Sequence, residues 1–242
     1  TFVASMPGDK TMNKTHVEIR NSKFGIRKIG FLSSARGAAL ALTLAFSGAA
    51  QIHAARIAAW DFTGEGTNNA TSTADVFDSL LDSSNTLTRG SGAAASTANN
   101  SFRTTGFQNN GIAISNTDYF QFTLSAADGK VLSLSTIDCY LAGTTSFSAS
   151  PGAQNQFAYS LDGTTFTLIG SPIVRIGNGA LTQVSLTSIS ALQSIPAGTT
   201  VTFRFYATGQ TTTGGWGFSS TAAGAYGLDI GGTIDGPATI PS

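Results

Sequence analysis

Carboxylates are the side chains in this sequence best suited to catalysis, because Asp61 and Glu65 flank the turn after the first alternating segment. A pair of carboxylates at a suitable separation can hydrolyse a glycosidic bond by acid–base chemistry. Together with Asp75, the same residues could instead hold calcium, a hard cation that prefers oxygen ligands. The chain has no Asp-x-Asp-x-Asp-Gly calcium loop. We expect no cofactor other than such a structural calcium ion.

Aromatic residues near the end of the chain offer a second kind of site. Trp216 lies among glycines in the segment 214–218, which also contains Phe218, and Tyr226 follows. Glycines can leave the face of a tryptophan open as a platform for a sugar ring, whereas most tryptophans fill a core. Both interpretations stay open for Trp216. We take Trp216, Phe218 and Tyr226 as the predicted ligand-binding residues.

The first part of the chain has the pattern of an export signal. The apolar, uncharged segment 37–46 is followed by small residues and preceded by four basic ones: Lys23, Arg27, Lys28 and Arg36. This pattern predicts cleavage by a signal peptidase after Ala54 or Ala55. The apolar run is shorter than the ~20 residues that a membrane-spanning helix needs. We therefore expect a secreted or cell-surface protein.

The signal peptide is expected to span residues 12–55, beginning at Met12, with 1–11 as upstream or appended residues. Its removal takes away His16 and His53, the only two histidines of the chain. The remaining residues then cannot form Ser-His-Asp or Cys-His catalytic groups or histidine-bearing zinc sites.

Charge and cysteine content narrow the classes further. From Arg56 onward the chain has six basic and eleven acidic residues, a poor composition for binding nucleic-acid phosphates. Cys139 is the only cysteine, so no disulfide can form within the chain. Its apolar strand context predicts a buried structural thiol rather than a nucleophile.

Alternation of apolar and polar residues recurs from residue 57 onward and predicts half-buried strands. The segments with this pattern are 57–62, 86–89, 111–115, 119–124, 131–141, 157–161, 165–169, 181–186, 201–205 and 228–234. Asp162 and Gly163 between two of them predict a hairpin. We expect an all-β fold, with one antiparallel, jelly-roll-like β-sandwich of about nine or ten strands over residues 56–235 and a tail at 236–242.

Two segments depart from simple alternation. In 131–141 the apolar phase changes, because Leu132 and Leu134 share one parity while Ile137 and Cys139 share the other. A β-bulge or break near residues 135–136 would reconcile the two phases. The segment 75–82 has apolar residues at helical spacing, which predicts a short helix or an irregular crossover.

Four short phrases, at 58–64, 87–90, 159–163 and 226–234, resemble exported bacterial proteins of the PEP-CTERM-sorted type, which are mostly uncharacterised. The resemblance implies a β-sandwich, secretion or surface display, and association with an extracellular polysaccharide matrix. It implies no catalytic residues. Residues 236–242 lack the Pro-Glu-Pro motif, the apolar helix and the basic cluster of that signal. Either the chain stops before the signal, or the likeness extends only to the domain.

These patterns lead to one main hypothesis and two alternatives. The main hypothesis is a non-catalytic, exported β-sandwich that binds a glycan or the extracellular matrix. The first alternative is a polysaccharide-active hydrolase or lyase that uses carboxylates. The second is a structural surface protein that self-assembles through its sheet edges.

Overall fold

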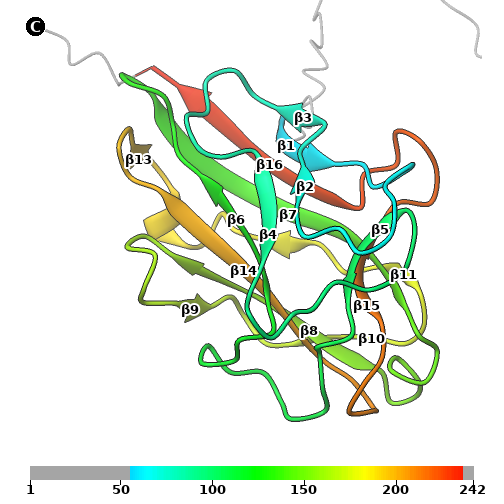
Figure 1. The fold of residues 1–242 in the computed structure, drawn as a ribbon. Coiled ribbons are helices and arrows are strands. Elements are labelled where there is room, and N and C mark those ends of the chain that lie inside the picture. The colour runs from blue at the N-terminus through cyan, green and yellow to red at the C-terminus, as the bar shows by residue number, and fades with distance from the viewer. Residues whose placement is uncertain (1–54, 237–242) are drawn as a thin grey trace, which may run out of the picture. The chain divides into compact units, whose positions relative to one another are not determined.

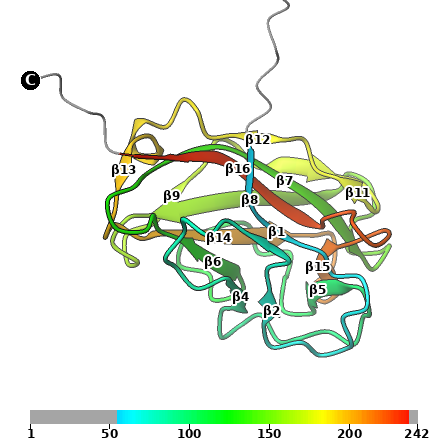
Figure 2. The same cartoon turned by 90° about the horizontal axis from the view of Figure 1, so that it is seen from above.

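The computed structural model describes residues 55–236, and nearly all of their regular structure is β. Two antiparallel sheets pack face to face (Figures 1 and 2). Within these residues the only helix is the short 3₁₀ segment η1 (Ser190–Leu192). The predicted all-β, antiparallel sandwich is therefore confirmed.

One sheet has nine strands and the other has seven. The nine-stranded sheet contains β1 (Ala55–Trp60), β3 (Val76–Phe77), β5 (Ser101–Thr104), β7 (Val131–Gly143), β11 (Gly179–Ala180), β12 (Val184–Ser185), β13 (Ile195–Pro196), β15 (Trp216–Ser219) and β16 (Leu228–Asp235). The seven-stranded sheet contains β2 (Ser72–Thr73), β4 (Thr86–Arg89), β6 (Phe120–Leu124), β8 (Ala153–Ser160), β9 (Thr167–Leu168), β10 (Ile173–Arg175) and β14 (Val201–Thr208).

The chain passes repeatedly between the two sheets. The order through the first sheet is β3-β1-β16-β7-β15-β5, with β11, β12 and β13 also paired to β7. The order through the second is β10-β8-β14-β6-β4-β2, with β9 beside β8. Strands β6, β7 and β8 are consecutive but lie in alternate sheets, a crossing connectivity typical of jelly rolls. Figure 2 shows β7 and β16 in one layer and β6 and β14 in the other.

The strand count is higher than the sequence predicts, since residues 55–236 form sixteen strands. Seven of them have only two or three residues, and of these only β9 and β12 lie within segments that alternation predicts. The predicted strand at 111–115 is irregular. The predicted helix at 75–82 is absent: Val76 and Phe77 pair with β1, and a turn closes where the Leu81 amide donates to the Asp78 carbonyl.

The bulge predicted near residues 135–136 is confirmed. On β16, Gly231 lies opposite Thr136 and Gly232 lies opposite Leu134, so Ser135 has no partner in this ladder. The extra residue shifts the buried parity of β7 from even to odd positions. Residues 138 and 140 consequently face away from the core, whereas 137 and 139 are buried.

Aromatic rings join the two sheets. Phe205 on β14 and Phe218 on β15 have ring centroids 4.8 Å apart. Alternation on β6 is as predicted, with Phe120 and Phe122 buried and Gln121 partly exposed. The Asp162-Gly163 hairpin is also confirmed, because Ala158 on β8 pairs with Leu168 on β9.

The predicted signal peptide lies outside the described residues except for Ala55, as do the predicted upstream residues 1–11 and the tail beyond Gly236. Along residues 55–236, no helix has the length and apolar character needed to cross a membrane.

Candidate ligand-binding face

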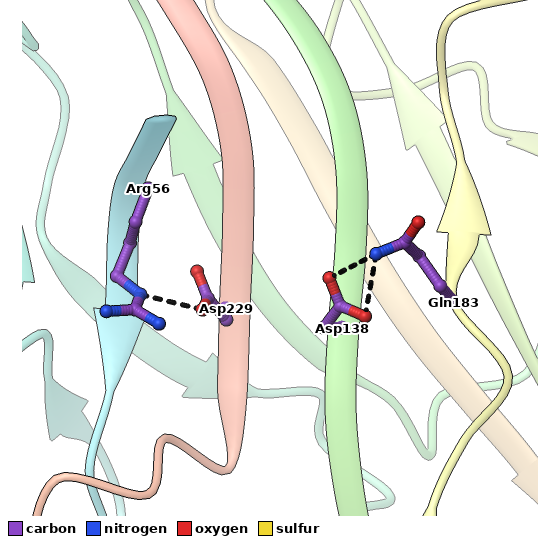
Figure 3. A network of polar contacts seen from close by, with 4 residues as sticks. All are labelled: Arg56, Asp138, Gln183 and Asp229. Atoms are coloured by element: carbon purple, nitrogen blue, oxygen red, sulfur yellow. Dashed lines mark hydrogen bonds and ion pairs between the residues drawn. The ribbon is translucent and has the colours of Figure 1, made fainter. Parts of the chain in front are cut away.

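A row of polar side chains crosses the outer face of the nine-stranded sheet (Figure 3). The Nε of Arg56 on β1 donates to Oδ2 of Asp229 on β16 at 2.7 Å. On β7, Asp138 accepts from the side-chain amide of Gln183 through both carboxylate oxygens, at 3.0 and 2.8 Å. The row thus joins four segments that are far apart in the sequence.

Strand parity explains why these side chains face outward. Leu228 and Ile230 of β16 are buried, so Asp229 between them lies on the opposite face. Asp138 lies in the same way between two buried residues of β7. The bulge at Ser135 sets this phase of β7, because without the extra residue the parity of the first half would continue.

Two carboxylates lie directly opposite each other in the row. Asp138 and Asp229 are partners in the antiparallel β7–β16 ladder. Like charges in such a pair destabilise a sheet, and the Arg56 guanidinium bonded to Asp229 opposes this effect. Burial raises the pKa of Asp229, the bond from Arg56 lowers it, and Asp138 raises it; the net pKa is above its ordinary value.

A hollow of about 360 Å³ opens beside this row. Its wall includes six side chains that define the Tyr226 hollow: Arg56, Asp138, Tyr140, Leu181, Tyr226 and Asp229. Ligand sites in proteins typically have volumes of roughly 300 to 1,000 Å³, so the hollow is large enough for a small ligand. It combines two aromatic rings with acceptors and a donor.

Arg56 connects the polar row to the aromatic wall. Its guanidinium carbon lies 4.2 Å from the centroid of the Tyr226 ring, within the range of a cation–π contact. The same side chain is hydrogen-bonded to Asp229, so Arg56 contacts both Tyr226 and Asp229 and helps to fix their positions. Of the three guanidinium nitrogens of Arg56, only Nε donates a hydrogen bond to another residue within 55–236. The two terminal amino groups are therefore available to a ligand.

The loop that carries Tyr226 is anchored by Asp61. Oδ2 of Asp61 accepts from the Gly224 amide at 2.6 Å, and its Oδ1 accepts from the Thr63 amide at 2.9 Å. Burial raises the pKa of Asp61, but these hydrogen bonds outweigh it and leave the pKa below its ordinary value. Asp61, a predicted catalytic residue, thus holds loop backbone through both carboxylate oxygens.

Glu65 and Asp75 are also engaged in local contacts. The Glu65 carboxylate accepts from the Ser72 hydroxyl and from the Asn69 amide. Burial raises the pKa of Glu65, and Ser72 and Asn69 lower it less, so it stays above its ordinary value. Asp75 accepts from the backbone amide of Asp61 at 2.6 Å. Neither Glu65 nor Asp75 lines the Tyr226 hollow.

Of the two interpretations left open for Trp216, the core is confirmed and the surface platform is wrong, and the predicted ligand-binding residue Phe218 lies in the core as well. Both side chains are completely buried, and the Trp216 indole donates to the Asn155 side chain at 2.8 Å. The neighbouring glycines serve close backbone packing instead: a Cβ at Gly217 would lie 2.3 Å from the Phe102 carbonyl oxygen. Of the three predicted ligand-binding residues, only Tyr226 lines the hollow.

Cys139 is a buried structural thiol, as predicted. Burial, and to a lesser extent Asp138, raises its pKa and keeps it from acting as a nucleophile. Over residues 55–236, no three histidine, cysteine or acidic side chains are arranged to hold a metal ion.

The sequence reasoning missed Asp138, Tyr140, Asp229 and Gln183. A signal was present for three of them, because the buried positions of 131–141 and 228–234 leave Asp138, Tyr140 and Asp229 on the outward parity. Gln183 carries no such signal, since it lies between two-residue strands.

Comparison with models of known protein families and with curated proteins finds no match for this chain. The function is therefore inferred from the geometry of this face.

Proposed function

We propose that this protein is a non-catalytic, exported β-sandwich that binds a glycan of the extracellular matrix in the Tyr226 hollow. The observation that carries the proposal is the grouping of two tyrosine rings, two carboxylates and a guanidinium around one open hollow. Export rests on the signal-peptide pattern of the sequence. The resemblance to exported bacterial proteins supports the same placement.

The chemistry of the hollow suits a sugar. Sugar hydroxyls donate to carboxylates and accept from guanidinium groups, and Asp138, Asp229 and Arg56 supply both kinds of partner. Tyr140 and Tyr226 add apolar surface with a polar edge, a combination common in binding sites. Because Arg56 holds Asp229 and Tyr226 in place, little side-chain entropy would be lost on binding.

A panel of polysaccharides tests the proposal, with both retention of the protein and release of products measured. We expect retention on at least one polymer without release of reducing ends. Tyr226→Ala is expected to weaken retention about tenfold, and Tyr226→Phe, which keeps the ring, by less. Failure to bind any polymer would rule out the proposed function.

Tyr119 provides a matched control for Tyr226. It is a partly exposed tyrosine with an arginine over its ring, since the Arg204 guanidinium carbon lies 3.9 Å from its centroid. Tyr119 directly precedes β6 of the seven-stranded sheet and does not line the Tyr226 hollow. Tyr119→Ala is therefore expected to leave retention unchanged.

A carboxylate-dependent hydrolase is a second candidate, and one observation favours it. Asp138 and Asp229 are direct cross-strand partners, and the pKa of Asp229 is raised by burial. A raised pKa suits a general acid, and an ionised partner suits a nucleophile. This candidate predicts release of reducing ends that Asp138→Asn abolishes, in the same panel.

A further inference from the structure

The charges around the Tyr226 hollow do not balance. Its wall contains two carboxylates, Asp138 and Asp229, and one cation, Arg56. The Arg56 guanidinium is bonded to Asp229. Asp138 is bonded only to Gln183 among the described residues, and that side chain is neutral. One negative charge at the hollow therefore has no positive partner within residues 55–236.

The position of Asp138 makes this charge costly. It lies directly opposite Asp229 in the β7–β16 ladder, where like charges repel. Burial is the main cause of the raised pKa of Asp229, and Asp138 is a smaller cause in the same direction. A cationic group bound beside Asp138 would relieve the repulsion and gain a charge-assisted hydrogen bond.

The net charge of the domain also favours a cationic ligand. From Arg56 onward the chain has eleven acidic and six basic residues, so its field attracts cations and repels anions. Within the wall of the hollow, Arg56 is the one basic side chain, and it is already paired.

From this arrangement we infer that the Tyr226 hollow selects glycans that carry a free, protonated amino group, with Asp138 as the residue that binds the ammonium. The inference rests on the proposed function and names its ligand class: a deacetylated amino-sugar polymer rather than a uronic-acid polymer. Neutral glycans use the tyrosines and hydroxyl contacts but lack the contact with the unbalanced charge.

Three soluble oligosaccharides of equal length test the inference: one of glucosamine, one of N-acetylglucosamine and one rich in uronic acid. Isothermal titration in mildly acidic buffer, where the sugar amine is protonated, gives the affinities. We expect the glucosamine oligomer to bind about fivefold more tightly than the N-acetylated one, as for a partly exposed ion pair. The uronic-acid oligomer should bind most weakly, and added salt should reduce the preference.

Asp138→Asn keeps the shape of the side chain but removes its charge, so the ratio of the affinities for the amino and the N-acetylated oligomer should fall from about fivefold to about one. Asp235→Asn is the matched control, because it makes the same change of net charge on the neighbouring strand β16, at an exposed residue outside the hollow. It should keep the fivefold preference.

The outcomes separate the inference from the proposed function. Equal binding of the amino and N-acetylated oligomers, or a preference that survives Asp138→Asn, would overturn the inference and leave glycan binding in place. A preference lost equally in Asp235→Asn would assign it to the overall charge and would also overturn the role of Asp138. Binding of none of the three would overturn the proposed function as well.

Discussion

Asp229 lies between a cation and an anion, and its ionisation reports on both neighbours. Removing the charge of Asp138 by Asp138→Asn should lower the pKa of Asp229, because the repulsion between the two carboxylates disappears. Arg56→Gln should raise it, because the hydrogen bond and the favourable charge are lost. Carbon-13 NMR titration of the aspartate carboxyl groups measures both shifts. Shifts of the same sign in the two variants would contradict this account of the row.

Truncation of Trp216 should destabilise the protein much more than truncation of Tyr226. Trp216→Ala leaves a cavity and an unpaired Asn155 amide oxygen, so we expect the free energy of unfolding to fall by about 3–5 kcal/mol. Tyr226→Ala, at a partly exposed site, should cost only about 1 kcal/mol. Urea denaturation followed by tryptophan fluorescence compares the two variants. A Trp216→Ala protein as stable as the parent would show that the indole is not in the core.

Residue types alone could not separate these two aromatics. The glycines around Trp216 are compatible with an exposed ring or with close strand contact, and only the φ of +154° and the 2.3 Å approach at Gly217 decide for contact. For Asp61 the residue type indicates only a carboxylate that could act in catalysis or bind calcium. Its hydrogen bond to the Gly224 amide, however, depends on a residue 163 positions away.

At the scale of the element, Asp61 should act on ligand binding through the loop that it anchors. Asp61→Ala removes the acceptor of the Gly224 and Thr63 amides, so the loop before Tyr226 loses its hydrogen bond to Asp61 and the turn at Thr63 loses another. We expect glycan affinity to fall about three- to tenfold, with a change of no more than about 2 kcal/mol in stability. Titration calorimetry and urea denaturation measure the two effects.

Asp61→Asn separates anchoring from catalysis, because its side-chain oxygen still accepts one of the two amide bonds. Affinity for the glycan should therefore recover part of the way toward that of the parent. If Asp61→Ala binds as tightly as the parent, the loop does not need this anchor.

The sequence was most informative about the longer strands. The change of parity between Leu134 and Ile137 predicted the bulge in β7, because alternation over eleven residues records which side faces the core. Of the two-residue strands, alternation predicted only β9 and β12, which lie within the segments 165–169 and 181–186. The other four depend on pairing with longer strands: β2 with β4, β3 with β1, and β11 and β13 with β7.

The ionisation of Asp118 should contribute to the pH dependence of the free energy of unfolding of the protein. Its side chain is buried, Oδ2 has no hydrogen-bond partner within residues 55–236, and burial raises its pKa above the ordinary 3.8. The folded state then holds this proton more tightly than the unfolded state. The contribution of Asp118 is complete below the ordinary pKa and is lost as the pH rises through the raised value.

Asp118→Asn mimics the protonated form and should remove this loss. Its free energy of unfolding should exceed that of the parent by a margin that grows from about pH 3 to about pH 7. Urea midpoints at several pH values give the difference, in which the contributions of the other carboxylates cancel. A margin that stays constant with pH, or that shrinks, would contradict the assignment.

The fold class could be predicted from composition and alternation. A two-layer sandwich has one core, and the apolar positions of each strand show which side of the strand faces that core. The binding face did not follow in the same way. Arg56, Asp138, Gln183 and Asp229 come together through the register of β1, β16 and β7, and register is a property of pairs of strands. Composition could indicate only that acidic groups would be in excess.

The central claim is that the Tyr226 hollow is the glycan-binding site, and NMR mapping tests it most directly. Titration of the nitrogen-15-labelled protein with the best oligosaccharide of the panel should shift the amides of residues 138–140 and 224–229 in a saturable way. Tyr226→Ala should strongly reduce these shifts at the same concentrations, as expected for an affinity about tenfold weaker, and Tyr119→Ala should not. Saturable shifts confined to the other sheet, or unchanged shifts in Tyr226→Ala, would contradict the account.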